Sequence, residues 1–134
     1  FEIYNYPTTA FVAHFVGQLN VLPARVVDAA AGRLALGDQP IVLEPPPQTS
    51  DGQMVSLAVR PEELELGAKE GHNNLQGSVE SITFLGSIVR VRANLGEASV
   101  HADLFNERLL VLPKAGDPVT INFPPHAAWV LGSQ

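Results

Sequence analysis

Residues 88–104 read IVRVRANLGEASVHADL, a stretch that alternates apolar and polar side chains on either side of one glycine. Successive side chains of a β-strand point to opposite faces of the sheet. Leu95-Gly96 supplies a turn between the two alternating runs. The stretch therefore predicts two half-buried antiparallel strands joined by a short connection. Val89, Val91, Ala93, Leu95, Val100, Ala102 and Leu104 form the apolar face, and Ile88, Arg90, Arg92, Asn94, His101 and Asp103 form the polar face.

The same period of two recurs along most of the chain. Turn signals rich in glycine, asparagine and aspartate separate the alternating runs. Many short strands at such spacing are typical of a small antiparallel barrel. We therefore predict an all-β fold, with further strands at 24–29, 33–36, 41–43, 55–60, 78–84 and 119–123.

The first residues follow a different pattern. Phe11 and Phe15 are four positions apart, as are Val12 and Val16, so a helix here would have one apolar face. A threonine at position 8 or 9 can cap its start, and Gly17 is a suitable end. The sequence predicts one short N-terminal helix within residues 1–18. A helix this short needs support, either from the β-domain or from a neighbouring domain.

A proline-rich connection begins with three successive prolines at 45–47 and divides the β-region near 44–54. Residues 20–26 and 73–79 both fit the pattern N-x-L-x-small-x-V. Two half-repeats within a β-domain of residues 19–134 would explain the match, and so would chance, because the pattern is short.

Composition excludes several classes of function. The chain has 134 residues, no cysteine and a net charge of −6, so disulfides and thiolate metal sites are excluded and polynucleotide binding is disfavoured. No apolar run reaches the length of a membrane span. The sequence contains no phosphate-binding loop and no nucleophile elbow. We expect no catalytic residue, cofactor or metal site in this chain.

A corner at the end of one strand is the first candidate site. Arg60 follows the run 57–59, Pro61 removes a ladder donor, and Glu62 opens a turn. The corner gathers a guanidinium and carboxylates, which could serve a ligand or partner or form only a local ion pair. Trp129 follows Pro124-Pro125, so we place it on a separate short segment as a core or interface anchor.

Two pairs on the polar faces are further candidates. Arg90 and Arg92 share a strand face and could clamp an anion, although solvent-facing arginines are the commoner case. His101 and Asp103 also share a face, but a zinc site needs three or four converging donors. We therefore interpret His101 and Asp103 as a solvated polar face.

Three segments carry a resemblance to a known family. Residues 3–20 read IYNYPTTAFVAHFVGQLN, 57–62 read LAVRPE and 77–86 read GSVESITFLG. The first resembles the boundary segment after the nucleotide-binding domain of importer-type ABC ATPases, I-Y-x-x-P-x-x-x-F-V-A-x-F-x-G-x-x-N. The second is similar to the V-R-P-E motif of that family, and the third to its G-x-V…F-L-G element.

The resemblance implies the C-terminal TOBE (transport-associated OB) region, a regulatory domain of OB-like barrel structure, of the polyamine or ferric-iron branch. It implies an absent ATPase domain that would bind ATP and Mg, so the chain itself would not be an enzyme. It also implies a homodimer, membrane subunits as partners and a cytoplasmic place at the inner membrane. A small-ligand or oxyanion sensor is the alternative function. The candidate regulatory or interface residues are Arg60, Pro61, Glu62, Arg90, Arg92 and Trp129.

Overall fold

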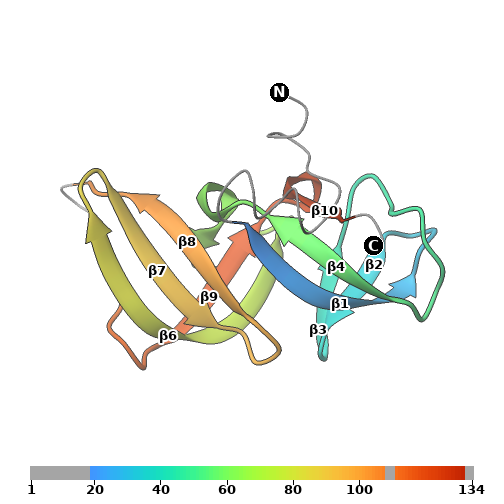
Figure 1. The fold of residues 1–134 in the computed structure, drawn as a ribbon, viewed down its shortest axis with the longest axis horizontal. Helices are drawn as coiled ribbons and strands as arrows, with labels where there is room; N and C mark the ends of the chain where they lie inside the picture. The colour runs from blue at the N-terminus through green and yellow to red at the C-terminus, as the bar shows by residue number, and fades with distance from the viewer. Residues whose placement is uncertain (1–18, 108–110, 132–134) are drawn as a thin grey trace.

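Two curled antiparallel sheets make up the part of the chain that the computed structural model describes, residues 19–107 and 111–131. They lie side by side along the long axis of the molecule (Figure 1). The first sheet contains β1 (Asn20–Asp28), β2 (Arg33–Leu36), β3 (Gln39–Val42), β4 (Met54–Val59) and β10 (Ala128–Val130). The second contains β5 (Glu65–Leu66), β6 (Asn73–Leu85), β7 (Ile88–Asn94), β8 (Ser99–Phe105) and β9 (Pro118–Phe123).

The two sheets have the same strand order. The first runs β10-β4-β1-β2-β3, and the second runs β5-β9-β6-β7-β8. β1 therefore corresponds to β6, β2 to β7, β3 to β8 and β4 to β9. All pairs are antiparallel, and both β1 and β6 shift register just after a buried valine, Val26 and Val79 respectively.

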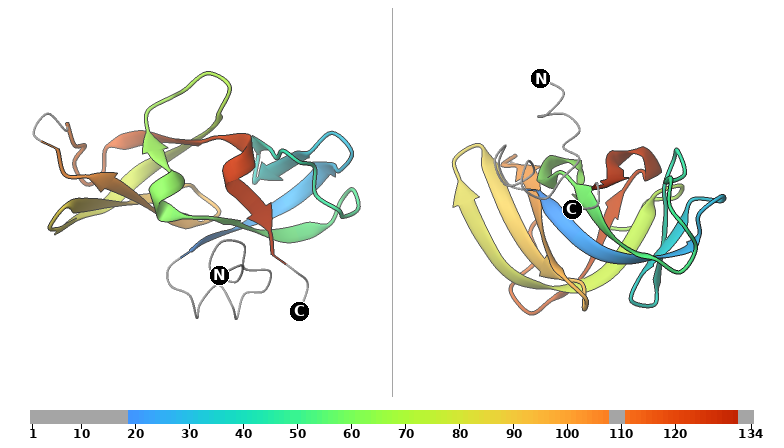
Figure 2. Two further views of the ribbon diagram at one scale, coloured as in Figure 1. Left: turned by 90° about the horizontal axis from the view of Figure 1, so that it is seen from above. Right: turned by 45° about the vertical axis from the view of Figure 1, so that its right-hand side comes forward.

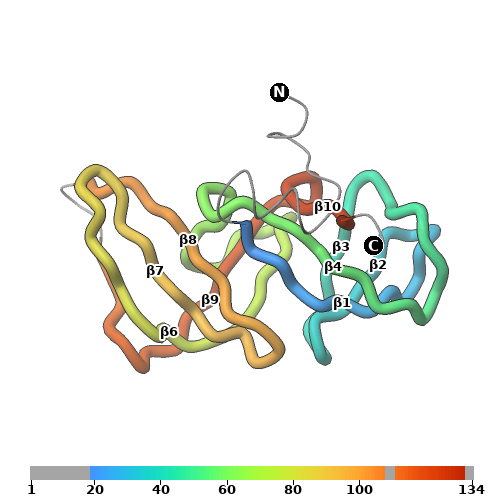
Figure 3. The backbone as a smooth tube through the Cα atoms, viewed as in Figure 1, coloured from blue at the N-terminus to red at the C-terminus, as the bar shows by residue number. Residues whose placement is uncertain are grey.

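Each sheet is completed by a strand from the other half of the chain, where the first half contains β1–β5 and the second half contains β6–β10. After β4 the chain makes a single 3-10 turn, η1 (Pro61–Glu63), and crosses to pair β5 with β9. After β9 it makes an equivalent turn, η2 (Pro125–Ala127), and crosses back to pair β10 with β4. The two turns lie on the same side of the molecule (Figure 2), and the path of both crossings can be followed in Figure 3.

One hydrophobic core continues through both sheets. Leu22, Leu57, Leu75, Ile121 and Phe123 are among its fully buried members. They come from β1, β4, β6 and β9, the strands at the centre of the two sheets. The alternation of burial along β7 follows the alternation of apolar and polar residues, whereas β1 buries Asn20 and exposes Val21 and Val27. A second, smaller cluster of Val79, Val89 and Val91 lies under the far end of β6 and β7.

The structure confirms the all-β fold and most of the predicted strands. Strand β6 begins at Asn73, five residues before the start of the strand predicted at 78–84. β5 and β10 were not predicted, because they have only two and three residues and pair with strands that are distant in sequence. Trp129 does lie on a separate segment after the proline pair.

Two further predictions, the N-terminal helix and the division into half-repeats, are not tested by the described residues. The predicted N-terminal helix falls in residues 1–18, outside the described residues. The connection after residue 43 joins β3 to β4 of the same sheet, so the passage between the sheets does not coincide with the division near 44–54. The division of the chain into half-repeats stays a prediction.

Candidate regulatory and interface site

The corner at Arg60 is formed where β4 ends. Arg60 is extended, with φ −75° and ψ 143°, and its carbonyl accepts a hydrogen bond from the N–H of Glu63 (3.0 Å). Pro61 starts η1 and is buried. Proline suits the first position of a helical turn, because the N–H that it lacks would have no partner there. Glu62 is exposed on the same turn. The corner therefore presents one guanidinium and the exposed carboxylates of Glu62 and Glu63 around a buried proline.

Trp129 joins this corner through the strand that crosses from the other half. β10 pairs with β4 so that Trp129 lies opposite Ala58, and Ala128 lies opposite Val59. The Arg60 guanidinium carbon is 5.0 Å from the centroid of the Trp129 ring, within the range of a cation–π contact. The structure thus brings Trp129 to the corner of Arg60, Pro61 and Glu62, although Trp129 is far from these three residues in sequence.

Arg90 and Arg92 lie on the outer face of the second sheet, away from this corner, and each binds a carboxylate. Arg90 donates from Nε and Nη2 to the two oxygens of Asp103, at 2.7 and 2.8 Å, across the β7–β8 pair. Arg92 donates from Nε to Glu80 at 2.7 Å. Glu80 also accepts from Asn94 and Ser99, and these contacts, Arg92 first, lower its pKa. The pair proposed as an anion clamp is therefore already neutralised by two acidic residues.

His101 lies on the same outer face, opposite Arg92. Its partial burial is the largest cause that lowers its pKa, followed by the charges of Arg90 and Arg92. The imidazole is consequently biased toward its neutral form. Within the described residues, no group of three or more histidine, cysteine, aspartate or glutamate side chains could hold a metal ion.

Sequence reasoning gave no role to two buried asparagines at the junction of the halves. Asn20, the first residue of β1, accepts from the N–H of His101 (2.7 Å) and donates to its carbonyl (2.9 Å). Asn73, the first residue of β6, makes the same two contacts with Val42, at 2.8 and 2.9 Å. Each carboxamide thus extends the edge strand of the opposite sheet. The shared pattern N-x-L-x-small-x-V was the signal that pointed to both.

Comparison with known proteins identifies the family. A family model described as "TOBE domain" matches residues 57–131, more than half of the chain. The chain belongs to the TOBE domain family. Its match includes the corner at Arg60, η1, β5–β9 and Trp129, and so covers most of the elements described above. The resemblance to the TOBE region of importer-type ABC ATPases is confirmed.

Curated relatives of this TOBE domain include import ATP-binding proteins with different solutes. PotA of Pseudomonas fluorescens strain Pf0-1, a spermidine/putrescine import ATP-binding protein, is 29% identical over 97% of the chain. MalK of Photorhabdus laumondii, for maltose/maltodextrin, is 32% identical over 93%. CysA of Xylella fastidiosa strain Temecula1, for sulfate/thiosulfate, is 44% identical over 75%. The chain spans only 37%, 35% and 26% of the length of these three relatives.

A solved structure confirms the OB-like fold of the TOBE domain. The cytoplasmic molybdate-binding protein ModG, crystallised with molybdate bound, superimposes with a TM-score of 0.69 over 85% of this chain and 96% of its own. The two sequences are 17% identical, so the likeness concerns the fold. In the described residues, no helix is long and apolar enough to cross a membrane.

Proposed function

We propose that this domain is the regulatory and dimerisation domain of the ATP-binding subunit of an ABC importer. The observation that carries the proposal is the alignment of 97%, 93% and 75% of the chain with 37%, 35% and 26% of three import ATP-binding proteins that serve unrelated solutes. A region shared by transporters of polyamines, sugars and oxyanions does not carry the chemistry of any one solute. A common role in the ATP-binding subunit fits this distribution.

In this proposal the catalytic chemistry belongs to the part of the relatives that the chain does not span. That part would bind ATP and Mg, and the parent protein would work at the cytoplasmic side of the inner membrane with membrane subunits. The Arg60 corner and Trp129 would form the regulatory contact, because they lie where the chain crosses between its two halves. A signal received there acts on both sheets at once.

Two measurements test the proposal. Calorimetry of the isolated chain with MgATP should show no binding; micromolar affinity for the nucleotide would contradict it. In the second, this chain replaces the aligned segment of Pseudomonas fluorescens PotA. The chimera should keep transporter-stimulated ATP hydrolysis, and PotA truncated before the segment should lose its regulation. If the truncated protein behaves like intact PotA, the regulatory role is wrong.

A small-ligand or oxyanion sensor is the second candidate, and the 44% identity to a sulfate/thiosulfate importer subunit favours it. Arg90 and Arg92 contribute little to it, since Asp103 and Glu80 hold both guanidinium groups. Arg60, whose guanidinium lies over the Trp129 ring, is the third candidate donor. A ligand that binds only the folded domain raises its melting temperature. A thermal-shift screen with sulfate, molybdate and spermidine should therefore show a rise for one of them, and no rise would dismiss this candidate.

A further inference from the structure

Two rows of side chains at matching positions on the two sheets differ in chemistry. In the first sheet, the row crosses β10, β4 and β1 at Trp129, Ala58 and Val21. In the second sheet, the row crosses β5, β9 and β6 at Glu65, Asn122 and Asn74. The positions match because each row lies one residue beyond the asparagine that begins β1 or β6. We call the first set the apolar row and the second set the polar row.

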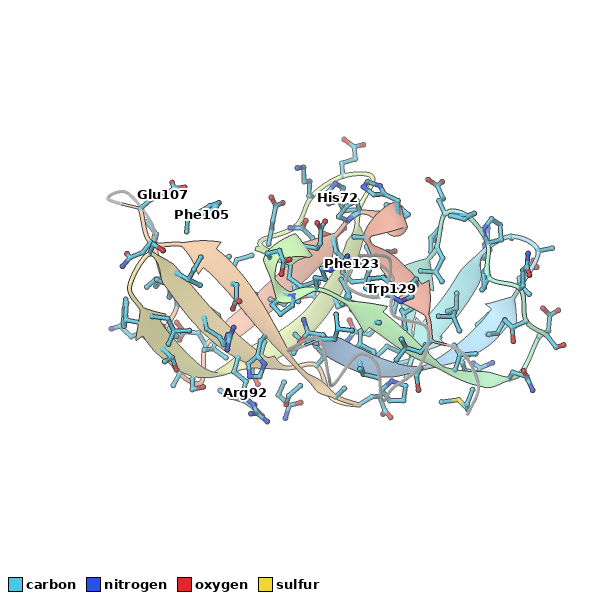
Figure 4. The ribbon with its side chains drawn as sticks, turned by 45° about the horizontal axis from the view of Figure 1, so that its top comes forward. His72, Arg92, Phe105, Glu107, Phe123 and Trp129 are labelled. Atoms are coloured by element: carbon cyan, nitrogen blue, oxygen red, sulfur yellow. The ribbon has the colours of Figure 1, made fainter. Side chains whose placement is uncertain are left out.

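The connection between β5 and β6 covers the polar row. Asn122 is 2% exposed, donates from Nδ2 to the Gly67 carbonyl (2.6 Å) and contacts Nδ1 of His72 through Oδ1 (2.9 Å). Asn74 accepts from the N–H of Lys69 (2.8 Å) and donates to the carbonyls of Lys69 (3.1 Å) and His72 (3.0 Å). His72 of this connection and Trp129 of the apolar row are both labelled in Figure 4. The polar row therefore holds the segment that leads into β6.

The apolar row has no carboxamide that could hold a segment in this way. Ala58 is nevertheless 0% exposed, although Ser56, two positions earlier on the same face of β4, is exposed. Neither hydrophobic cluster found among the described residues includes Ala58. Its burial thus comes from the outer side of the sheet, where apolar contact is the interaction that a methyl group offers.

The segment before β1 has the right place and chemistry to cover the apolar row. It leads into β1 at Asn20 as the connection between β5 and β6 leads into β6. Its apolar residues at helical spacing are Phe11, Val12, Phe15 and Val16. From Phe15 to Asn20 the chain can span about 16 Å, at about 3.3 Å per residue. The row crosses three strands, which takes about 10 Å, so the segment can reach along it.

We propose that the apolar face of residues 11–16 docks on the apolar row of the same chain, in the place that the connection between β5 and β6 takes on the polar row. The docked segment meets the Arg60 corner, because Trp129 belongs to the row and contacts Arg60. In the importer subunit proposed above, a movement of the preceding part would then reach Arg60 through Trp129. Only this last consequence rests on the proposed function.

Nuclear magnetic resonance of the whole chain tests the docking directly. In a sample with labelled alanine methyl groups, the Ala58 methyl should show nuclear Overhauser contacts with ring protons of Phe11 or Phe15. The single variants Phe11→Ser and Phe15→Ser assign the two rings. Absence of a contact between the assigned Ala58 methyl and either ring overturns the proposal.

Acrylamide quenching of Trp129, the one tryptophan of the chain, gives a second readout. The double variant Phe11→Ser/Phe15→Ser should raise the quenching constant at least about twofold, because the ring loses its apolar cover. The matched control is Phe84→Ser/Phe105→Ser, which makes the same changes at two exposed positions of the second sheet and should leave quenching unchanged. Circular dichroism spectra verify that each variant is folded.

The outcomes separate docking from its alternatives. An unchanged quenching constant in Phe11→Ser/Phe15→Ser overturns the proposal, and so do equal increases in both double variants, which would indicate a general loosening. Dilution of the wild type from about 100 μM to about 1 μM should leave quenching unchanged. An increase on dilution would mean that the segment of another copy covers the row, which overturns docking within one chain. None of these results affects the ATPase chimera, so the proposed function is tested separately.

Discussion

At the scale of single residues, the Asn73 carboxamide makes the hydrogen bonds that a further strand would make with β3 at the edge of the first sheet. It satisfies both backbone groups of Val42, whose N–H and C=O point away from β2 at the edge of the first sheet. We expect Asn73→Ala to lower the free energy of unfolding by about 1–3 kcal/mol, because two polar groups lose their partners at a half-buried site. Asn73→Asp should not restore stability, since a carboxylate cannot donate to the Val42 carbonyl.

Urea denaturation followed by circular dichroism measures this change. Gln48→Ala is the control, because Gln48 is exposed on the loop before β4 and should change stability by no more than about 0.5 kcal/mol. Equal stability of Asn73→Ala and the wild type would show that solvent replaces the amide without cost.

His101 gives the domain a pH dependence of defined sign. Its pKa in the folded state is lowered from the ordinary value, first by burial and then by Arg90 and Arg92, with Asp103 and Glu80 opposing the shift. The unfolded chain therefore binds more protons near pH 6 than the folded chain. Its stabilising contribution is complete above the unfolded pKa of about 6.5 and is lost as the pH falls toward the lower folded pKa.

We expect the free energy of unfolding to decrease between pH 7 and pH 5, and His101→Gln to flatten the part of this slope that His101 contributes. Urea titrations at half-unit steps of pH measure the slope. Thr83→Ala, which removes no ionisable group from the same outer face, should keep it. A slope that is identical in His101→Gln and the wild type would contradict the assignment.

At the scale of elements, the curl of β6 depends on Gly77. A Cβ atom at this position would collide with the backbone carbonyl of Asn94 and come within 2.8 Å of a Leu95 methyl group. The missing side chain lets β6 bend tightly over the end of β7 while its first part pairs with β9. We expect Gly77→Ala to cost about 1–3 kcal/mol, as overpacking usually does.

Thermal unfolding of Gly77→Ala beside Ser78→Ala checks this expectation, since Ser78 is the next residue of the same strand. The glycine variant should melt several degrees lower than the serine variant. If both melt at the same temperature, β6 can shift away from β7 and the close approach is not required.

The elements also show where sequence reasoning succeeds and fails. The long strands β7 and β8 follow directly from alternation, because a half-buried sheet imposes a period of two on its residues. β5 and β10 carry no such signal, since two or three residues give no period and their stability comes from a partner far away in sequence. Arg60 and Pro61 were placed correctly at a strand end. The contact of Arg60 with the Trp129 ring was not predicted, because it depends on the register of β10 against β4. The ion pairs of Arg90 with Asp103 and of Arg92 with Glu80 were not predicted, because sequence spacing does not show which side chains meet across neighbouring strands.

At the scale of the whole molecule, the crossed strands and the two asparagine contacts join both halves into one folding unit. Each half contributes a strand to the other sheet, and the main core contains residues of both. We therefore expect a single cooperative unfolding transition. The chain has one tryptophan, Trp129, which reports on the first sheet through its fluorescence.

Coincidence of the fluorescence transition with the far-ultraviolet circular dichroism transition tests this expectation, because the dichroism reports on both sheets. The two curves should have the same midpoint in urea. A fluorescence midpoint that precedes or follows the dichroism midpoint would mean that the halves unfold separately.

The exchange of β5 and β10 has a consequence for dissected forms of the molecule. A fragment that ends after β5 contains β4 but lacks β10, the strand that pairs with β4. Its last strand, β5, also lacks its partner β9. Neither piece can finish its sheet without material from the other. Two such fragments, synthesised separately and then mixed, should reassemble into the native arrangement. Either fragment alone should exchange a strand with another copy of itself or keep an incomplete sheet.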